Sequence, residues 1–182
     1  MGFTDVLEKL GYCYESEEAY QLIDQLAEFV SYHAIDQSAD LAQQRGSYPA
    51  FAGSGWSKGI LPIDTIDTLS DERAVPVKIS TEQQLDWQAL RQKVKRGMRN
   101  ATLMAIAPTA NIGHIAGTTP GIDPQFAQIF SRSTLNGKFL EVNVNLVRDL
   151  KARDLWDDIK DDVLAAQGDI QQIDVVPQQL KN

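Results

Sequence analysis

The chain has little sulfur and no long apolar segment, and each shortage removes a class of protein. Cys13 is the only cysteine among 182 residues, which excludes an internal disulfide framework and a cysteine-based zinc site. No apolar run approaches the roughly 20 residues that a membrane-spanning helix needs. The first ten residues lack the basic and apolar regions of an export signal, and Val6 stands where a myristoylation signal has Ser or Thr. These absences predict a cytoplasmic protein with no membrane partner.

Positive charge is also scarce. The chain has 17 Lys and Arg against 25 Asp and Glu, and the formal net charge of −8 argues against binding a nucleic acid polymer. A hydrophobic content of 43% and a charged content of 23% are ordinary for a globular protein. Because 182 residues fit one domain and no internal repeat or domain boundary is evident, we expect a single domain.

The first quarter of the chain predicts two helices. Apolar residues recur on one face over 3–10, and Gly11 would end this short helix. Ser16 would cap a long helix with two glutamates in its first turn, which would end near Arg45. A helix of about 29 residues would be about 44 Å long, which suits an outer helix of an α/β barrel.

Glycine and proline interrupt the middle of the chain. Over 46–80 the periodicity fades, and we expect an irregular connection that is either functional or mobile. Ser80 and Gln83 resemble a capping box, which predicts a helix from there through Arg96. Gly97 would end that helix.

The last third predicts a hairpin and two helices. The Asn136-Gly137 pair favours the positive φ angles of a tight turn between two strands. Gly168 would end the second helix, and the glutamine-rich tail over 168–182 is expected to be loosely held. The expected elements are strands over 126–132 and 138–143 and helices over 146–154 and 156–166.

A junction in the middle of the chain carries the clearest chemical signal. An apolar, strand-like run over 101–107 meets Pro108, and small residues and glycines follow. A helix that starts at such a turn has N–H groups without partners and a partial positive charge, so the turn can hold a phosphate by backbone alone. A connection that binds nothing has the same small residues, so the pattern leaves both readings open.

Nine residues spaced over 22 positions give this junction a specific signature: Trp87, Leu90, Gly97, Met98, Arg99, Asn100, Met104, Ala105 and Pro108. The signature resembles that of the ribonucleotide reductase large (alpha, catalytic) subunit. The resemblance covers nearly the whole chain and implies an α/β fold, the C-terminal part of a ten-stranded α/β barrel. Residues 1–182 would form a single partial domain, an incomplete barrel with outer helices and one hairpin. Further blocks that resemble the family are GFTDVLEKLG, the SEEA helix with YHAI, RGSYPAF, SGWSKGILPID, AGTTPGIDP and NLVRDLKARDLW.

The resemblance also implies a binding site. In that family the turn after the strand grips the diphosphate of the substrate. Relatives often have a further hydroxyl or an acidic residue in this turn, whereas Ala110 and Ile112 offer only backbone, so side-chain contacts would come from Thr109 and Asn111. The match falls residue by residue on Pro108, Thr109, Ala110, Asn111 and Ile112.

The cysteines that the family's reaction needs are missing. One cysteine must carry a thiyl radical and a further pair must reduce the sugar, whereas Cys13 is a single thiol that does not match the radical-bearing loop. The resemblance therefore implies a segment that begins after that loop and stops before the redox cysteines at the C-terminus. Such a segment would have no catalytic residue, bind no metal or cofactor itself and be inactive alone.

Two functions remain open. As part of a ribonucleoside-diphosphate reductase, an oxidoreductase of deoxyribonucleotide synthesis, the chain would hold the ribonucleoside diphosphate substrate. Its partners would be the remaining N-terminal segment of the large subunit and a small subunit or another cofactor that generates the radical. The alternative is a non-catalytic interaction module that completes or occupies a reductase barrel.

Overall fold

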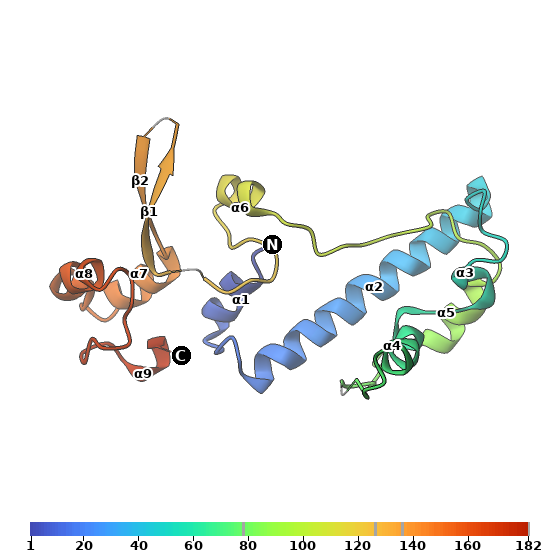
Figure 1. Cartoon of the computed structure of the whole chain (residues 1–182), viewed down its shortest axis with the longest axis horizontal. Coiled ribbons are helices and arrows are strands. Elements are labelled where there is room, and N and C mark those ends of the chain that lie inside the picture. The colour runs from blue at the N-terminus through green and yellow to red at the C-terminus, as the bar shows by residue number, and fades with distance from the viewer. Residues whose placement is uncertain (78, 126, 136, 182) are drawn as a thin grey trace. The chain divides into compact units, whose positions relative to one another are not determined.

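The described residues fold into helices and one two-stranded sheet, and the chain divides into two compact units (Figure 1). The first unit consists of residues 1–20 and 106–182, and the second of residues 21–105; each has its own cluster of buried apolar side chains. Within the described ranges, no helix has the length and apolar character to cross a membrane. The computed structural model describes residues 1–77, 79–125, 127–135 and 137–181.

The second unit is built on the long helix α2 (Glu17–Arg45), which starts in the first unit. Its predicted start and end are confirmed, and Ser16 Oγ accepts the N–H of Ala19 at 3.2 Å as a helix cap. Apolar side chains of α2 pack with those of α5 (Trp87–Val94). The buried cluster consists of Ile35, Ala39, Leu61, Trp87, Leu90, Val94 and Met98.

Two predictions in the second unit were wrong. The helix expected from Ser80 begins at Trp87, because Asp86 Oδ1 caps it by accepting the N–H of Ala89 at 2.9 Å. It ends at Val94 rather than Arg96. The described residues of the connection over 46–80 also form three short helices, two of which are too brief to show an apolar period, while the third has only two apolar residues. These are α3 (Gly55–Lys58), the 3-10 helix η1 (Pro62–Asp64) and α4 (Thr65–Arg73).

In the first unit the predicted short helix, the hairpin and the two later helices are confirmed. Helix α1 (Phe3–Leu10) is closed by Gly11, whose φ of 73° is left-handed. The two strands pair antiparallel with Arg132 opposite Phe139, while Phe126 and Asn136 of the predicted hairpin lie outside the described residues. The elements are α1 (Phe3–Leu10), α6 (Ala110–Ala116), β1 (Ile129–Thr134), β2 (Gly137–Val142), α7 (Val144–Lys151), α8 (Trp156–Ala165) and α9 (Gln178–Lys181).

The tail after Gly168 is packed rather than loose. Ile170 and Val176 are only 4% and 3% exposed, and Leu180 on α9 packs against the same cluster. The apolar residues among the glutamines therefore complete the core of the first unit, which corrects the expectation for 168–182. The buried cluster consists of Ile129, Leu146, Leu150, Ile159, Val163, Ile170 and Val176.

The strand expected over 101–107 is absent, since this described segment is irregular. A strand needs a neighbour to pair its backbone groups, and the strands of the described residues, β1 and β2, pair with each other. The mixed helix and strand class is confirmed. The ten-stranded arrangement stays a prediction, because the described residues hold two strands.

Candidate functional site

The predicted binding residues lie together where α6 begins. Thr109 precedes the helix and Ala110 is its first residue, so the predicted helix start after Pro108 is confirmed. Pro108, Ala110, Asn111 and Ile112 are exposed, and Thr109 is half-buried. We call residues 108–112 the α6 turn. Its backbone is accessible to a ligand, as a phosphate site requires.

The side chain of Thr109 does not cap α6. Its Oγ1 accepts the N–H of Gly121 at 2.7 Å instead. By helix geometry the N–H groups of Ala110, Asn111 and Ile112 have no carbonyl partner within α6. A hydroxyl that accepts one bond still has its hydrogen to donate. The turn therefore offers backbone donors and one hydroxyl donor toward a bound anion.

A loop, residues 117–123, packs behind the α6 turn. Gly113 is buried, and a Cβ there would lie 2.9 Å from the carbonyl oxygen of Thr118. The N–H of Thr118 donates to the Gly113 carbonyl oxygen at 2.9 Å. Glycine is needed at 113 because the loop backbone occupies the space that a side chain would fill.

Helix α1 holds this loop from its other side. Asp5 Oδ2 accepts the N–H and the Oγ1 hydroxyl of Thr119, each at 2.7 Å. Thr119 is 3% exposed, and its carbonyl oxygen accepts the N–H of Gly2 at 2.8 Å. Thr4 Oγ1 donates to the carbonyl oxygen of Asp123 at 2.5 Å. The N-terminal helix is thus bonded to the loop that supports the turn.

The hairpin approaches α6 through charged side chains. On β2, Glu141 Oε2 lies 3.2 Å from His114 Nδ1, and Glu141 Oε1 accepts a hydrogen bond from Arg132 on β1 at 3.1 Å. These three residues line a cavity of about 760 Å³ together with Phe130 and Phe139. His114 therefore contacts Glu141 within the first unit.

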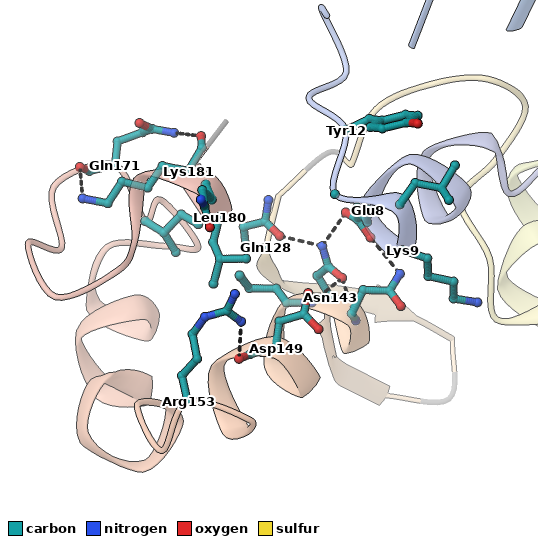
Figure 2. Close-up of a pocket in the computed structure, with 16 residues that line it drawn as sticks. Glu8, Lys9, Tyr12, Gln128, Asn143, Asp149, Arg153, Gln171, Leu180 and Lys181 are labelled. Carbon is teal, nitrogen blue, oxygen red and sulfur yellow. Dashed lines mark hydrogen bonds between the residues drawn. The ribbon is translucent and has the colours of Figure 1, made fainter. Parts of the chain in front are cut away.

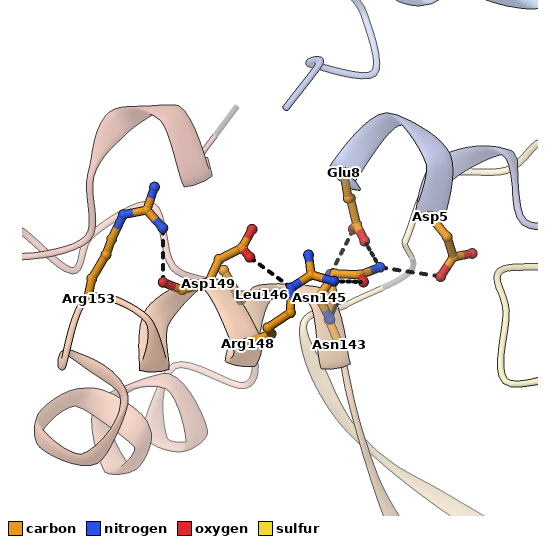
Figure 3. A network of polar contacts seen from close by, with 8 residues as sticks. All are labelled: Asp5, Glu8, Asn143, Asn145, Leu146, Arg148, Asp149 and Arg153. Atoms are coloured by element: carbon orange, nitrogen blue, oxygen red, sulfur yellow. Dashed lines mark hydrogen bonds and ion pairs between the residues drawn. The ribbon is translucent and has the colours of Figure 1, made fainter. Parts of the chain in front are cut away.

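A second cavity, of about 510 Å³, lies between α1, α7 and α9 of the same unit (Figure 2). Asn143 Oδ1 caps α7 by accepting the N–H groups of Asn145 and Leu146 at 3.0 and 3.2 Å. Glu8 on α1 accepts from the amides of Asn143 and Asn145, each at 2.7 Å (Figure 3). The net pKa of Glu8 is raised, chiefly by burial and further by the nearby carboxylates of Asp5 and Asp149, although the two amide hydrogen bonds lower it. These hydrogen bonds between Glu8 and the two asparagine amides join α1 to the start of α7.

Sequence reasoning missed the residues that support the turn. Asp5, Thr119 and Gly121 are separated from their partners by 12 residues or more, and no local spacing connects them. The resemblance of the GFTDVLEKLG and AGTTPGIDP blocks to the family was the available signal. Among the residues that the structure describes, no group of three or more His, Cys, Asp or Glu side chains is arranged to hold a metal ion.

Comparison with known proteins identifies the family to which the chain is similar. Residues 1–182 match the family model of the ribonucleotide reductase barrel domain. The ribonucleoside-diphosphate reductase subunit alpha of Chlamydia trachomatis is 42% identical over 185 residues, which cover 100% of this chain and 18% of that protein. The large subunit of Caenorhabditis elegans is 36% identical over 182 residues, covering 99% of this chain and 22% of that protein.

A third relative is the subunit alpha of Helicobacter pylori, which is 42% identical over 147 residues and covers 80% of this chain. The chain spans about a fifth of the length of these relatives, 18% to 22%. The family match extends over every block of the chain, including the α6 turn and the hairpin. The chain therefore belongs to the ribonucleotide reductase barrel-domain family, of which it represents a partial segment.

Proposed function

We propose that this chain is the substrate-diphosphate-binding segment of a ribonucleoside-diphosphate reductase large subunit. The observation that carries the proposal is the orientation of Thr109, whose Oγ1 accepts from Gly121 instead of capping α6. The N–H groups of Ala110, Asn111 and Ile112 are thereby left for an anion. Pro108 completes this turn and leads the chain into it.

The role of the segment is to position the substrate. A diphosphate at the α6 turn accepts hydrogen bonds from the backbone, the Thr109 hydroxyl and the Asn111 amide, and hydrogen bonds to charged groups are among the stronger ones. Fixing both phosphates also fixes the ribose relative to the rest of the site. The hydrogen abstraction and the reduction take place at cysteines of another segment, since Cys13 is this chain's single thiol.

Exposed apolar side chains around the turn support the proposal that another protein segment binds there. Ile106, Ile112 and Ile115 are 74%, 55% and 88% exposed. Large apolar groups exposed close together mark surfaces that other protein segments cover. The partner that we propose is the remaining N-terminal segment of the large subunit, with the radical supplied by a small subunit or another cofactor. Deoxyribonucleotide synthesis by this assembly is proposed to take place in the cytoplasm.

The test is the substitution Ala110→Pro in the assembled enzyme. Proline removes one N–H donor and disfavours the ψ of 29° at Thr109, yet proline is tolerated at the first position of a helix. We expect the KM for CDP to rise by about tenfold or more, because a hydrogen bond to a charged group is lost. Assembly, measured by size-exclusion chromatography, should be unchanged.

The matched control is Ala110→Gly, which keeps the N–H and should leave the KM close to that of the parent enzyme. An unchanged KM in Ala110→Pro would contradict the proposal. If Ala110→Pro completes an active enzyme whose KM for CDP is unchanged, the interaction module that completes a reductase barrel becomes the better description.

A further inference from the structure

We propose that Asp5 on α1 is a positioning residue for the α6 turn, acting through Thr119. This inference rests on the proposed function and adds a residue that lies more than 100 positions away in the sequence. Asp5 bonds to the loop behind the turn, and the turn bonds to the diphosphate.

The first step is the hold of α1 on Thr119. Its N–H and its hydroxyl both donate to Asp5 Oδ2 at 2.7 Å, and its carbonyl oxygen accepts from Gly2 at 2.8 Å. Every polar group of Thr119 is thus hydrogen-bonded either to Asp5 on α1 or to Gly2, which precedes α1. At 3% exposure, Thr119 has no access to water as a substitute partner. Its position is therefore determined by α1.

The second step connects Thr119 with the α6 turn. One residue before it, Thr118 donates its N–H to Gly113 at 2.9 Å. Two residues after it, Gly121 donates its N–H to Thr109 Oγ1 at 2.7 Å. The loop therefore contacts α6 itself just before Thr119 and the α6 turn just after it. A shift of Thr119 moves the Gly121 N–H, and the Thr109 hydroxyl then becomes free to cap α6 and to compete with a diphosphate.

Glu8 provides a comparison one helical turn further along α1. It also accepts two hydrogen bonds, but from Asn143 and Asn145 near the start of α7 (Figure 3). Asp5 Oδ1 has only a long contact of 3.4 Å with Asn145. The two carboxylates of α1 thus bind different segments: Glu8 binds the start of α7, whereas Asp5 binds the loop that supports the α6 turn.

The experiment compares Asp5→Ala with Glu8→Ala in the assembled reductase, with CDP as the substrate. We expect Asp5→Ala to raise the KM about 2- to 30-fold, the range typical of couplings through packed networks, and to retain kcat. Glu8→Ala should leave the KM unchanged even where it lowers the melting temperature. Asp5→Asn, which keeps one acceptor oxygen, should restore part of the affinity.

Equal KM values for Asp5→Ala and Glu8→Ala would overturn the inference, as would a loss of kcat at constant KM. If Asp5→Ala does not fold, Thr119→Val and Thr119→Ser decide the question. Valine removes only the hydroxyl and should raise the KM, whereas serine should not, and identical KM values would overturn the inference.

Ala110→Pro measured in parallel separates the two proposals. A raised KM in Ala110→Pro together with a normal KM in Asp5→Ala overturns the role of Asp5 alone. A normal KM in Ala110→Pro overturns the proposed function.

Discussion

Glu28 shows how one side chain can join distant segments. Its Oε1 accepts hydrogen bonds from the N–H groups of Gln84 and Leu85 and from the indole of Trp87, at 2.8, 3.0 and 2.8 Å. Burial raises the pKa of Glu28, but these three hydrogen bonds outweigh it and the net pKa is lowered. The carboxylate on α2 therefore fixes the segment that enters α5 by accepting three donors at one oxygen.

At the residue scale we predict that Glu28→Gln destabilises the chain by about 1 kcal/mol at pH 7, because a neutral amide accepts the three bonds less well and the site is near solvent. A lowered pKa contributes stability above the ordinary Glu value of about 4.3, and the contribution is lost as the pH falls through the folded-state pKa. The difference in unfolding free energy between the parent chain and Glu28→Gln should therefore be smaller at pH 3 than at pH 7.

Urea unfolding at both pH values measures this effect, with Asp24→Asn as the control, an exposed acid on the same helix. A difference that stays constant between pH 7 and pH 3 would show that the charge of Glu28 is not involved.

Helix α7 shows how one residue can join several elements. Asn143 caps it with Oδ1 and donates from Nδ2 to Glu8 on α1 and Gln128 before β1, at 2.7 and 2.8 Å. Asn143 is 6% exposed. An amide is suited to this position because it accepts at one end and donates at the other, whereas the other good cap residues lack the donors or the reach.

At the scale of elements we predict that Asn143→Asp costs more stability at pH 7 than at pH 5. The aspartate keeps the cap but places a second carboxylate against Glu8, whose pKa burial has already raised. Asn143→Ser is the control, since it keeps a cap oxygen and loses the two donor bonds, with an expected cost of about 1–3 kcal/mol. Chemical unfolding followed by circular dichroism at the two pH values is the measurement, and an equal cost of Asn143→Asp at both would refute the repulsion.

At the scale of the whole molecule, the segment that leads into the α6 turn, residues 101–107, lacks a neighbouring strand among the described residues. From Met104 to Ala107 the side chains are exposed, with Ile106 at 74%, and no strand of the described residues pairs with this backbone. Apolar side chains on an unpaired extended segment invite pairing with another strand. The missing neighbour explains why a sequence of strand character is irregular here.

We therefore predict that residues 101–107 become paired when the chain assembles with the rest of the large subunit. Their amide hydrogens should exchange at least about tenfold more slowly in the assembly, since each factor of ten corresponds to about 1.4 kcal/mol of protection. Hydrogen exchange with mass spectrometry measures this, and the amides in the middle of α2 serve as the internal reference. Exchange in 101–107 that is unchanged by assembly would show that this segment stays outside the barrel.

The sequence by itself determined the elements whose signals are local. Ser16 predicted the start of α2, Gly11 the end of α1, and the Asn136-Gly137 sequence the hairpin, because caps and tight turns depend on a few neighbouring residues. The family resemblance also predicted the family to which the chain belongs and the position of the α6 turn, which begins at Pro108.

Only the tertiary structure decided the features that need partners far away in the sequence. Glu28 on α2 accepts the N–H groups of Gln84 and Leu85 just before α5, the tail after Gly168 packs into a core, and the predicted strand over 101–107 stays unpaired. The contact of Asp5 with Thr119 belongs to the same group. Local propensity is a weak preference of each segment, whereas burial and hydrogen-bond pairing depend on which segments meet, and that is settled when the chain folds.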